Sequence, residues 1–226
     1  MFLFMIPWEY MKLLDGGNYM FLEKIKNGLS QNQPLFIGEE TAMRSAILIP
    51  LVQVNEEWHV LFEVRSLTMR RQPGDISFPG GRIDPTDASP EEAAIRETHE
   101  ELGIDPSAIQ VLGQMSAFIP TSSFVVYPFV ATIDHHQTYS FNKDEVKETF
   151  TIPLKWLLDH KPYVHKVPVH PMPLTDFPYE KIANGNQYQW RSRVIEEWFY
   201  DYEQYTIWGL TARVLKHFID SIKKEV

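Results

Sequence analysis

An acidic cluster near the middle of the chain carries its clearest chemistry. Glu97, Glu100 and Glu101 fall on one arc of a helix that turns by about 100° per residue. Like charges this close repel one another by roughly 0.2–0.5 kcal/mol per pair. A hard divalent cation such as Mg²⁺ or Mn²⁺ turns the repulsion into binding energy, because both ions prefer oxygen ligands. The cluster therefore predicts a metal site that holds phosphate groups.

The residues around the cluster predict the helix that carries it. Ser89 suits the N-cap, Pro90 suits the first helical position, and Glu92 completes a capping box. Gly103 predicts where the helix ends. A solvated acidic face, with Arg96 as its ion-pair partner, is the alternative interpretation. A capped helix between a glycine pair and a glycine stop favours the metal site.

The segment from residue 80 to residue 104 resembles the Nudix box, Gly-x5-Glu-x7-Arg-Glu-U-x-Glu-Glu-x-Gly-U, in which U is a bulky apolar residue. Thr98 stands where an aliphatic residue is usual and keeps part of the packing volume. The resemblance implies a diphosphatase that acts on a nucleoside diphosphate joined to another group. The second half of the box is matched without a gap by Arg96, Glu97, Glu100, Glu101, Gly103 and Ile104.

The first half of the box departs from this pattern. Gly81 lies one residue too far from Arg96, and the first glutamate of the box falls on Ala88. Asp87 sits beside that position, and Asp84 is nearby. We therefore expect a one-residue insertion in the turn before the helix.

The resemblance also implies a role for each matched residue. Glu97, Glu100 and Glu101 would bind Mg²⁺ or Mn²⁺. The carbonyl of Gly81 would be a further metal ligand. Arg96 would orient one of the glutamates from behind.

A later acidic segment, starting at Glu145, resembles the family's segment after the core sheet, in which an acidic residue often approaches the metal site. Glu145, or Glu148 in its place, is expected to supply a further ligand or the catalytic base. Either side chain could instead be surface charge. The predicted catalytic residues are Glu97, Glu100, Glu101, Arg96 and Glu145.

A second pattern directly precedes the box. It reads Arg65-Ser66-x3-Arg70-x3-Gly74-x3-Phe78-Pro79-Gly80-Gly81 and resembles the extra signature of the coenzyme A diphosphatase branch of Nudix hydrolases. Arginine suits bidentate phosphate contacts, and glycine allows a close approach of the backbone. Ion pairing of the arginines with the acidic helix is the alternative. The predicted substrate-binding residues are Arg65, Arg70, Gly74 and Phe78.

The two patterns together imply hydrolysis of coenzyme A, or of an acyl or oxidised derivative, to 3′,5′-ADP and a 4′-phosphopantetheine product. ADP-ribose, a dinucleotide or a nucleoside triphosphate stays open as the substrate. A non-catalytic nucleotide-sensing module of the same fold is a third alternative. The retained glutamates argue against a sensor, which could lose them.

The bulk properties agree with a small-molecule substrate. The net charge of −9 argues against nucleic-acid binding, which depends on Lys and Arg that neutralise phosphates. The chain has no cysteine, so a disulfide framework and a thiolate metal site are excluded. We expect a cytoplasmic protein that acts as a monomer or a homodimer.

The chain begins with an apolar run, MFLFMIPWEYMKLL. No basic region precedes the run, Pro7 and Glu9 interrupt it, and it is shorter than the ~20 apolar residues that span a bilayer. We expect a peripheral N-terminal extension over residues 1–19, or alternatively a natural start at Met20, and no membrane association. A single Nudix hydrolase domain is expected over residues 20–226.

Alternating strand and helix patterns predict a mixed α/β domain. The resemblance implies an α/β/α sandwich with a mixed sheet and a catalytic box helix. A hairpin is predicted at residues 43–65, a second strand pair at 109–134, and a strand with a short helix at 145–159. Further helices are expected over 21–31 and from Thr206 or Gly209 onward.

The remainder of the C-terminal part has less pattern. The Pro-rich stretch 162–178 is expected to be an irregular excursion, followed by one or two strands. Three aromatic residues there either stack on adenine or pantetheine or belong to the core. They are Tyr202, Tyr205 and Trp208.

Overall fold

The computed structural model describes residues 22–27, 36–121, 123–134 and 140–223. These residues fall into two compact units, Met1–Ala42 and Met43–Val226. In the first unit, residues 22–27 are helical, as expected for part of the 21–31 segment. The predicted extension over residues 1–19 lies outside the described residues, so a domain start at residue 20 stays a prediction.

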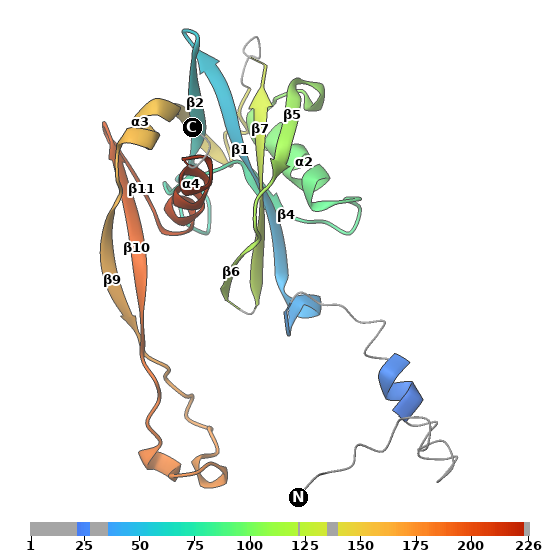
Figure 1. Ribbon diagram of the computed structural model, residues 1–226, viewed down its shortest axis with the longest axis vertical. Helices are drawn as coiled ribbons and strands as arrows, with labels where there is room; N and C mark the ends of the chain where they lie inside the picture. Colours follow the sequence, from blue (N-terminus) through green and yellow to red (C-terminus); the bar gives the residue numbers. More distant parts are fainter. Residues whose placement is uncertain (1–21, 28–35, 122, 135–139, 224–226) are drawn as a thin grey trace, which may run out of the picture. The chain divides into compact units, whose positions relative to one another are not determined.

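The second unit is built on a mixed sheet of eight strands (Figure 1). Its main order is β3-β2-β1-β7-β5, while β4 pairs with β1, β6 with β7 and β8 with β2. Only the β1–β7 pair is parallel among these pairings. The strands are β1 (Met43–Val54), β2 (Glu57–Arg65), β3 (Ile76–Ser77), β4 (Gly80–Arg82), β5 (Ile109–Gln114), β6 (Phe118–Thr121), β7 (Phe124–Ile133) and β8 (Val146–Pro153).

The predicted hairpin forms between β1 and β2. Asn55 and Glu56 both have positive φ, at 50° and 68°, and Val54 pairs with Glu57 across the turn. Two consecutive residues with positive φ match the right-handed twist of the strands that they join. Both strands are buried over most of their length, because the sheet is covered on its two faces.

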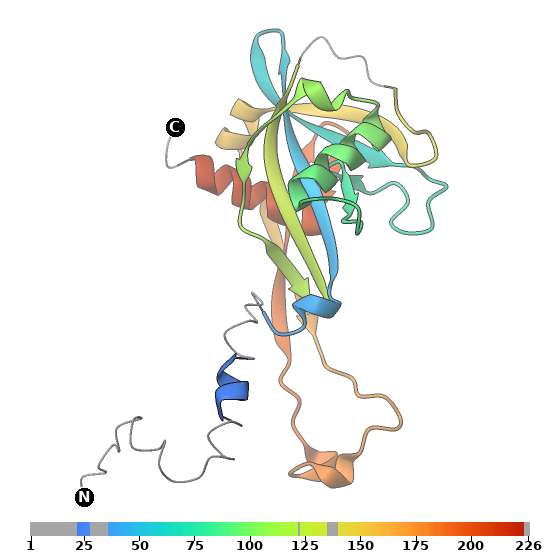
Figure 2. The ribbon, with the colours of Figure 1, turned by 90° about the vertical axis from the view of Figure 1, so that its right-hand side faces the viewer.

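Helices lie on both faces of this sheet (Figures 1 and 2). Helix α2 (Pro90–Leu102) covers one face and helix α4 (Gly209–Ile222) covers the other. Successive side chains of β1 point to opposite faces of the sheet. Ile47 and Ile49 point to the α4 side, where they belong to the core cluster that contains Leu215. The expected α/β fold with a mixed sheet and helices is confirmed, and α4 begins at Gly209.

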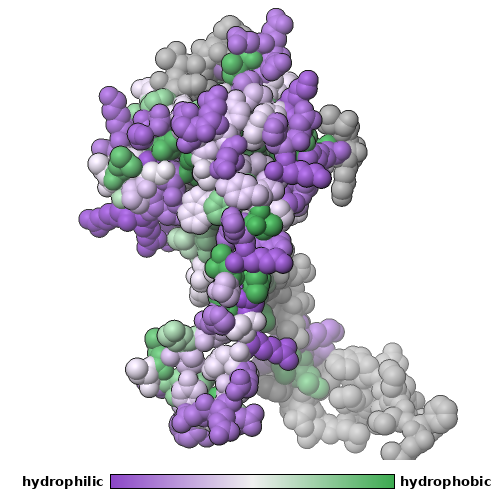
Figure 3. All heavy atoms as spheres, turned by 90° about the vertical axis from the view of Figure 1, so that its left-hand side faces the viewer, coloured by the Kyte–Doolittle hydropathy of each residue, from purple (hydrophilic) through white to green (hydrophobic). Residues whose placement is uncertain are grey.

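A second sheet lies beyond α4, with the order β11-β10-β9. Its strands are β9 (Tyr163–Val169), β10 (Arg193–Tyr202) and β11 (Tyr205–Trp208), and helix α3 (Leu154–Asp159) leads into it from β8. Figure 3 shows this side of the molecule, where apolar side chains lie among mostly hydrophilic ones. Short 3-10 turns complete the described elements: Glu39–Thr41, Pro106–Ala108, Tyr179–Lys181 and Gly185–Gln187.

The prediction of an irregular excursion over 162–178 is wrong for its first part, because Tyr163–Val169 is strand β9. Nearly all of β9 is exposed, so the sequence lacks the alternation that marks a half-buried strand. Pro168 is tolerated because β9 is an edge strand, where a missing N–H breaks no ladder. None of the helices in the described part of the chain is long and apolar enough to cross a membrane.

Leu215 tests the core between α4 and the sheet. Its side chain is fully buried in the core cluster. We expect Leu215→Ala to lower the free energy of unfolding by about 2–5 kcal/mol, because it removes packed methyl groups and leaves a cavity. Urea denaturation of both proteins measures the difference. The exposed neighbour His217, changed to alanine, is the matched control, and an equal loss in both variants would contradict the assigned packing.

Candidate active site

Helix α2 has the ends that its sequence predicts. The Oγ of Ser89 accepts a hydrogen bond from the Glu92 amide at 3.1 Å, and the Glu92 carboxylate accepts one from the Ala88 amide at 2.7 Å. Gly103 ends the helix in the left-handed region, with φ of 68°. The box helix therefore begins and ends where its capping residues require.

The three box glutamates lie at different depths. The Glu100 side chain is 51% exposed, and that of Glu97 is 18% exposed. Glu101 is 5% exposed, and its Oε2 accepts a hydrogen bond from the Gly80 amide at 2.8 Å. The exposure of the three carboxylates thus decreases from Glu100, in solvent, through Glu97 to Glu101, which lies against strand β4.

Arg96 ties the helix to the turn before it. Its Nε and Nη2 contact the two carboxylate oxygens of Asp87 at 2.9 and 3.0 Å. Its Nη1 contacts Glu97 at 2.9 Å and Glu100 at 3.1 Å. Nη2 also donates to the Arg82 carbonyl at 3.1 Å. The guanidinium is therefore in position to orient two of the box glutamates.

Asp87 was not among the predicted site residues. It lies beside the position where the box has its first glutamate, and the guanidinium of Arg96 lowers its carboxyl pKa. The only signal in the sequence was the one-residue offset of the turn. Asp87 closes that turn as well, because its carboxylate accepts from the Asp84 amide at 2.8 Å.

Gly81 lies against the carboxylate of Glu97. A Cβ at Gly81 would lie 2.4 Å from Cδ of Glu97 and 2.5 Å from its Oε2, so any side chain there would displace the Glu97 carboxylate. Gly81 thus gives Glu97 room beside the backbone of β4. This contact brings together two of the predicted metal-binding residues.

Glu63 is a second site residue that sequence reasoning missed. It lies within the buried strand β2, is 1% exposed, and accepts a hydrogen bond from Ser77 at 2.8 Å. Its other oxygen, Oε2, is buried without a hydrogen-bond partner among the described residues. In the sequence it is a single acidic residue in an apolar strand, so nothing marks which carboxylates it will face.

The structure brings Glu145 to this group. Its charge raises the pKa of Glu63, Glu97 and Glu101. The Glu145 carboxylate accepts a hydrogen bond from Asn142, whose backbone amide donates to the Glu101 carbonyl at 2.9 Å. The alternative residue, Glu148, instead pairs with Lys147 at 3.0 Å.

The cluster formed by Glu63, Glu97, Glu101 and Glu145 disfavours additional negative charge. Burial is the largest cause of the raised pKa of Glu63, Glu97 and Glu101. The neighbouring carboxylates raise it further, and for Glu101 the strongest of these is Glu63. Buried charges of one sign oppose ionisation until a cation compensates them.

The donor set fits a hard divalent cation. It consists of carboxylate oxygens beside a backbone carbonyl, and one oxygen of Glu63 is buried with no partner among the described residues. Within the described ranges, no three His, Asp or Glu side chains already converge as ligands would. Arg96 holds Glu97 and Glu100 at present, so convergence requires these side chains to turn.

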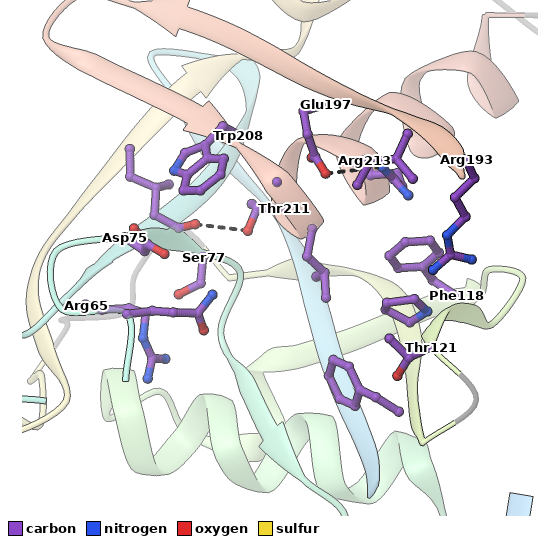
Figure 4. Close-up of a pocket in the computed structure, with 17 residues that line it drawn as sticks. Arg65, Asp75, Ser77, Phe118, Thr121, Arg193, Glu197, Trp208, Thr211 and Arg213 are labelled. Carbon is purple, nitrogen blue, oxygen red and sulfur yellow. Dashed lines mark hydrogen bonds and ion pairs between the residues drawn. The ribbon is translucent and has the colours of Figure 1, made fainter. Parts of the chain in front are cut away.

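A cleft of about 610 Å³ is lined by residues of β3, of β10 and of the start of α4, among them Ser77, Glu197 and Thr211 (Figure 4). Ser77 connects the cleft with the buried carboxylates, because it lines the cleft and donates a hydrogen bond to Glu63. Arg65 also lines the cleft, and its Nε is buried without a partner among the described residues. Arg193 and Arg213 lie at the other side of the cleft, near Phe118.

The other predicted substrate-binding residues have different surroundings. Arg70 is exposed. Gly74 has φ of 77° and its amide donates to the Arg65 carbonyl at 3.2 Å, so it shapes the loop after β2. Phe78 is buried and stacks on Phe62 with ring centroids 5.0 Å apart, which is a core position.

The three C-terminal aromatic residues divide in the same way. Tyr205 stacks on Phe150 and Tyr202 packs edge-on against Trp156. Trp208 is half exposed and lines the cleft. Of the three, Trp208 is the one positioned for a ligand.

A glycine-containing strand, β4, and the acidic helix α2 face one another on a mixed α/β sheet, which is the class of fold and site that the sequence predicts. The chain belongs to the Nudix family, because the NUDIX domain model matches residues 42–199. It is a Nudix diphosphatase.

Individual relatives agree with the family. The peroxisomal coenzyme A diphosphatase NUDT7 of Mus musculus is 35% identical over 121 residues, which are 54% of this chain and 51% of the mouse protein. The chain thus spans about half the length of that relative. The uncharacterized Nudix hydrolase NudL of Escherichia coli strain K12 is 34% identical over 173 residues, 76% of this chain and 79% of NudL.

Solved structures with a similar chain path include a MutT/nudix family protein from Enterococcus faecalis. It has a TM-score of 0.45 and 16% identity, and the match covers 90% of this chain and 68% of that one. A C. elegans Ap4A hydrolase binary complex has a TM-score of 0.42 and 19% identity, over 49% of this chain and 80% of that one.

The raised pKa values predict how stability depends on pH when divalent ions are chelated. Glu63 and Glu101 have folded-state pKa values above the ordinary 4.5, so their contribution is fully present below about pH 4.5. It is lost as the pH rises through the raised values. We expect the Tm in EDTA to fall between about pH 5 and about pH 8.

The variant Glu101→Gln removes one of the two buried carboxylates, whereas Asp87, whose pKa is lowered, stays ionised throughout this pH range. The Tm of the variant should fall less over the same pH range and exceed that of the wild type at the upper end. Parallel curves for the two proteins would show that the buried carboxylates carry no such penalty.

Proposed function

We propose that this Nudix diphosphatase hydrolyses coenzyme A, or an acyl or oxidised derivative, to 3′,5′-ADP and a 4′-phosphopantetheine product. The single observation that carries the proposal is the shared boundary of the cleft and the carboxylates at Ser77 and Arg65. The pattern before the box and the name of the mouse relative support the same substrate.

The residues of the acidic cluster have different proposed roles. Glu97, Glu100, Glu101 and the Gly81 carbonyl would hold Mg²⁺ or Mn²⁺. When bound, the metal would neutralise the diphosphate and lower the pKa of a coordinated water. Arg96 would keep Glu97 and Glu100 in orientation through its contacts with both.

The reaction itself needs one base. A water oxygen forms a bond to one phosphorus of the diphosphate, and the P–O bond to the bridging oxygen breaks. The bridging oxygen leaves with the other phosphate. Glu145 is the candidate to accept the proton of the water, because it lies near enough to Glu97 and Glu101 for its charge to raise their pKa, and it makes no ion pair with Arg96.

The far side of the cleft suits a second phosphate. Arg213 is already engaged, since it donates to the Glu196 carbonyl at 2.7 Å and lies over the Phe118 ring. The Arg193 side chain is exposed and makes no hydrogen bond or ion pair with any described residue. We assign Arg193 to the 3′-phosphate of coenzyme A, with the diphosphate at Arg65.

A substrate panel tests the proposed activity. Purified protein in Mg²⁺ or Mn²⁺ should release 3′,5′-ADP from coenzyme A faster than it cleaves ADP-ribose, NADH or a damaged nucleoside triphosphate. Product analysis by chromatography identifies which bond is broken. Glu97→Gln should lower kcat by about 10²-fold or more, because it removes a charge from the site.

Preferred turnover of another compound in the panel would replace the substrate. Binding without turnover would indicate a nucleotide sensor of the same fold. Circular dichroism of Glu97→Gln controls for loss of structure, and wild-type kcat in this variant would remove the proposed role of the helix carboxylates.

Arg193 has its own test, which uses dephospho-coenzyme A as the substrate that lacks the 3′-phosphate. We expect Arg193→Gln to lower kcat/KM for coenzyme A about tenfold, or ~1.4 kcal/mol, through the lost charge-assisted contact. The same variant should leave dephospho-coenzyme A turnover unchanged. Arg191→Gln, an exposed arginine outside the cleft lining, is the matched control. An equal loss on both substrates would refute the phosphate contact.

A further inference from the structure

Glu63 has one carboxylate oxygen that nothing in the fold explains. The residue lies in β2, is 1% exposed, and its Oε2 is buried with no hydrogen-bond partner among the described residues. An unsatisfied buried polar group costs about 1–3 kcal/mol, and more when it is charged. A purely structural position of this kind would be filled at lower cost by an apolar residue.

The orientation of Glu63 is set from the cleft side. Ser77 donates to Oε1 at 2.8 Å, and β2 pairs with β3 so that Glu63 and Ser77 are register partners. One oxygen is therefore occupied and the other is left free. This geometry holds the free oxygen in place without neutralising it.

Glu63 alternates along β2 with Phe62, which belongs to the core cluster on the α4 side, so the Glu63 side chain points toward the face of the sheet that α2 covers. The charge of Glu63 acts on Glu101 more strongly than that of Glu97 or Glu145. Arg65 is the cation that acts on Glu63. Glu63 is thus part of the group to which the box helix contributes, although it comes from a different element.

We propose that Glu63 is a further metal ligand of this site, contributed by the sheet and oriented by Ser77. The proposal rests on the proposed metal-dependent function and adds a residue to it. The metal would face carboxylates from α2 on one side and from β2 on the other. Ser77 is a positioning residue, since it acts through Glu63 and also borders the substrate cleft.

Metal affinity tests the proposal without activity. The electron paramagnetic resonance signal of free Mn²⁺ reports the bound fraction during a titration of the protein. We expect Glu63→Gln to raise the Kd for Mn²⁺ about tenfold to a hundredfold, the range found when metal-site partners are removed. Glutamine keeps the shape and can still accept from Ser77, so the fold is retained.

Two further variants complete the experiment. Glu57→Gln removes one exposed negative charge from the same strand and should change the Kd by less than about twofold. Ser77→Ala should weaken Mn²⁺ binding in the same direction as Glu63→Gln but to a smaller extent. The Tm of metal-free Glu63→Gln should rise above that of the wild type, and its gain in Tm on addition of Mn²⁺ should shrink.

The outcomes separate this inference from the proposed function. Glu63→Gln that is more stable without metal but keeps the wild-type Kd would make Glu63 structural and overturn the inference. If the wild-type protein binds Mn²⁺ more tightly than Glu63→Gln but does not cleave coenzyme A, the proposed substrate is refuted and the inference about Glu63 stands.

Discussion

The hydrogen bond from the Gly80 amide to the buried carboxylate of Glu101 joins the box helix to the sheet. It spans 2.8 Å, and it compensates part of the cost of burying a carboxylate. Such a contact requires the β4 backbone to lie close to its neighbour β1. Gly80 makes this possible, because a Cβ at its φ of 143° would lie 2.3 Å from the Ala46 carbonyl oxygen. Once Glu101 is anchored, the positions of Glu97 and Arg96 relative to β4 are fixed as well, because the helix sets the spacing between the three residues.

The buried carboxylates that suit the site for a metal also lower the stability of the metal-free fold. Burial and mutual repulsion raise the pKa of Glu63, Glu97 and Glu101, so the ionised site opposes folding when no cation is present. The fold tolerates this because the core on the other face of the sheet, between β1, β2 and α4, is apolar and fully packed. Active sites commonly store destabilisation that the surrounding structure offsets. In a Nudix protein the bound metal is the natural compensating charge.

The sequence predicted what depends on local rules. The caps of α2 and the β1–β2 turn follow from residue types over a few positions, and both are confirmed. The short strands β3 and β4 were not predicted from these local patterns. Glu63 and Asp87 could not be found this way, because their importance arises only from partners across the sheet and across the turn before α2. Strand β9 was missed because an exposed edge strand leaves no hydrophobic alternation. The roles predicted for Arg65, Arg70, Gly74 and Phe78 stay predictions, although Phe78 is packed in the core.

The turn before helix α2 is closed by its own hydrogen bonds. The Asp87 amide donates to the Asp84 carbonyl at 3.0 Å, and the Asp84 amide donates to the Asp87 carboxylate. The turn is therefore a closed unit before the helix begins, and the one-residue insertion expected in it stays a prediction. Asp87 then holds Arg96 by two contacts, while Gly81 still lies against Glu97. The closed turn thus connects strand β4 to the acidic helix in a way that places Gly81 beside Glu97 and Asp87 beside Arg96.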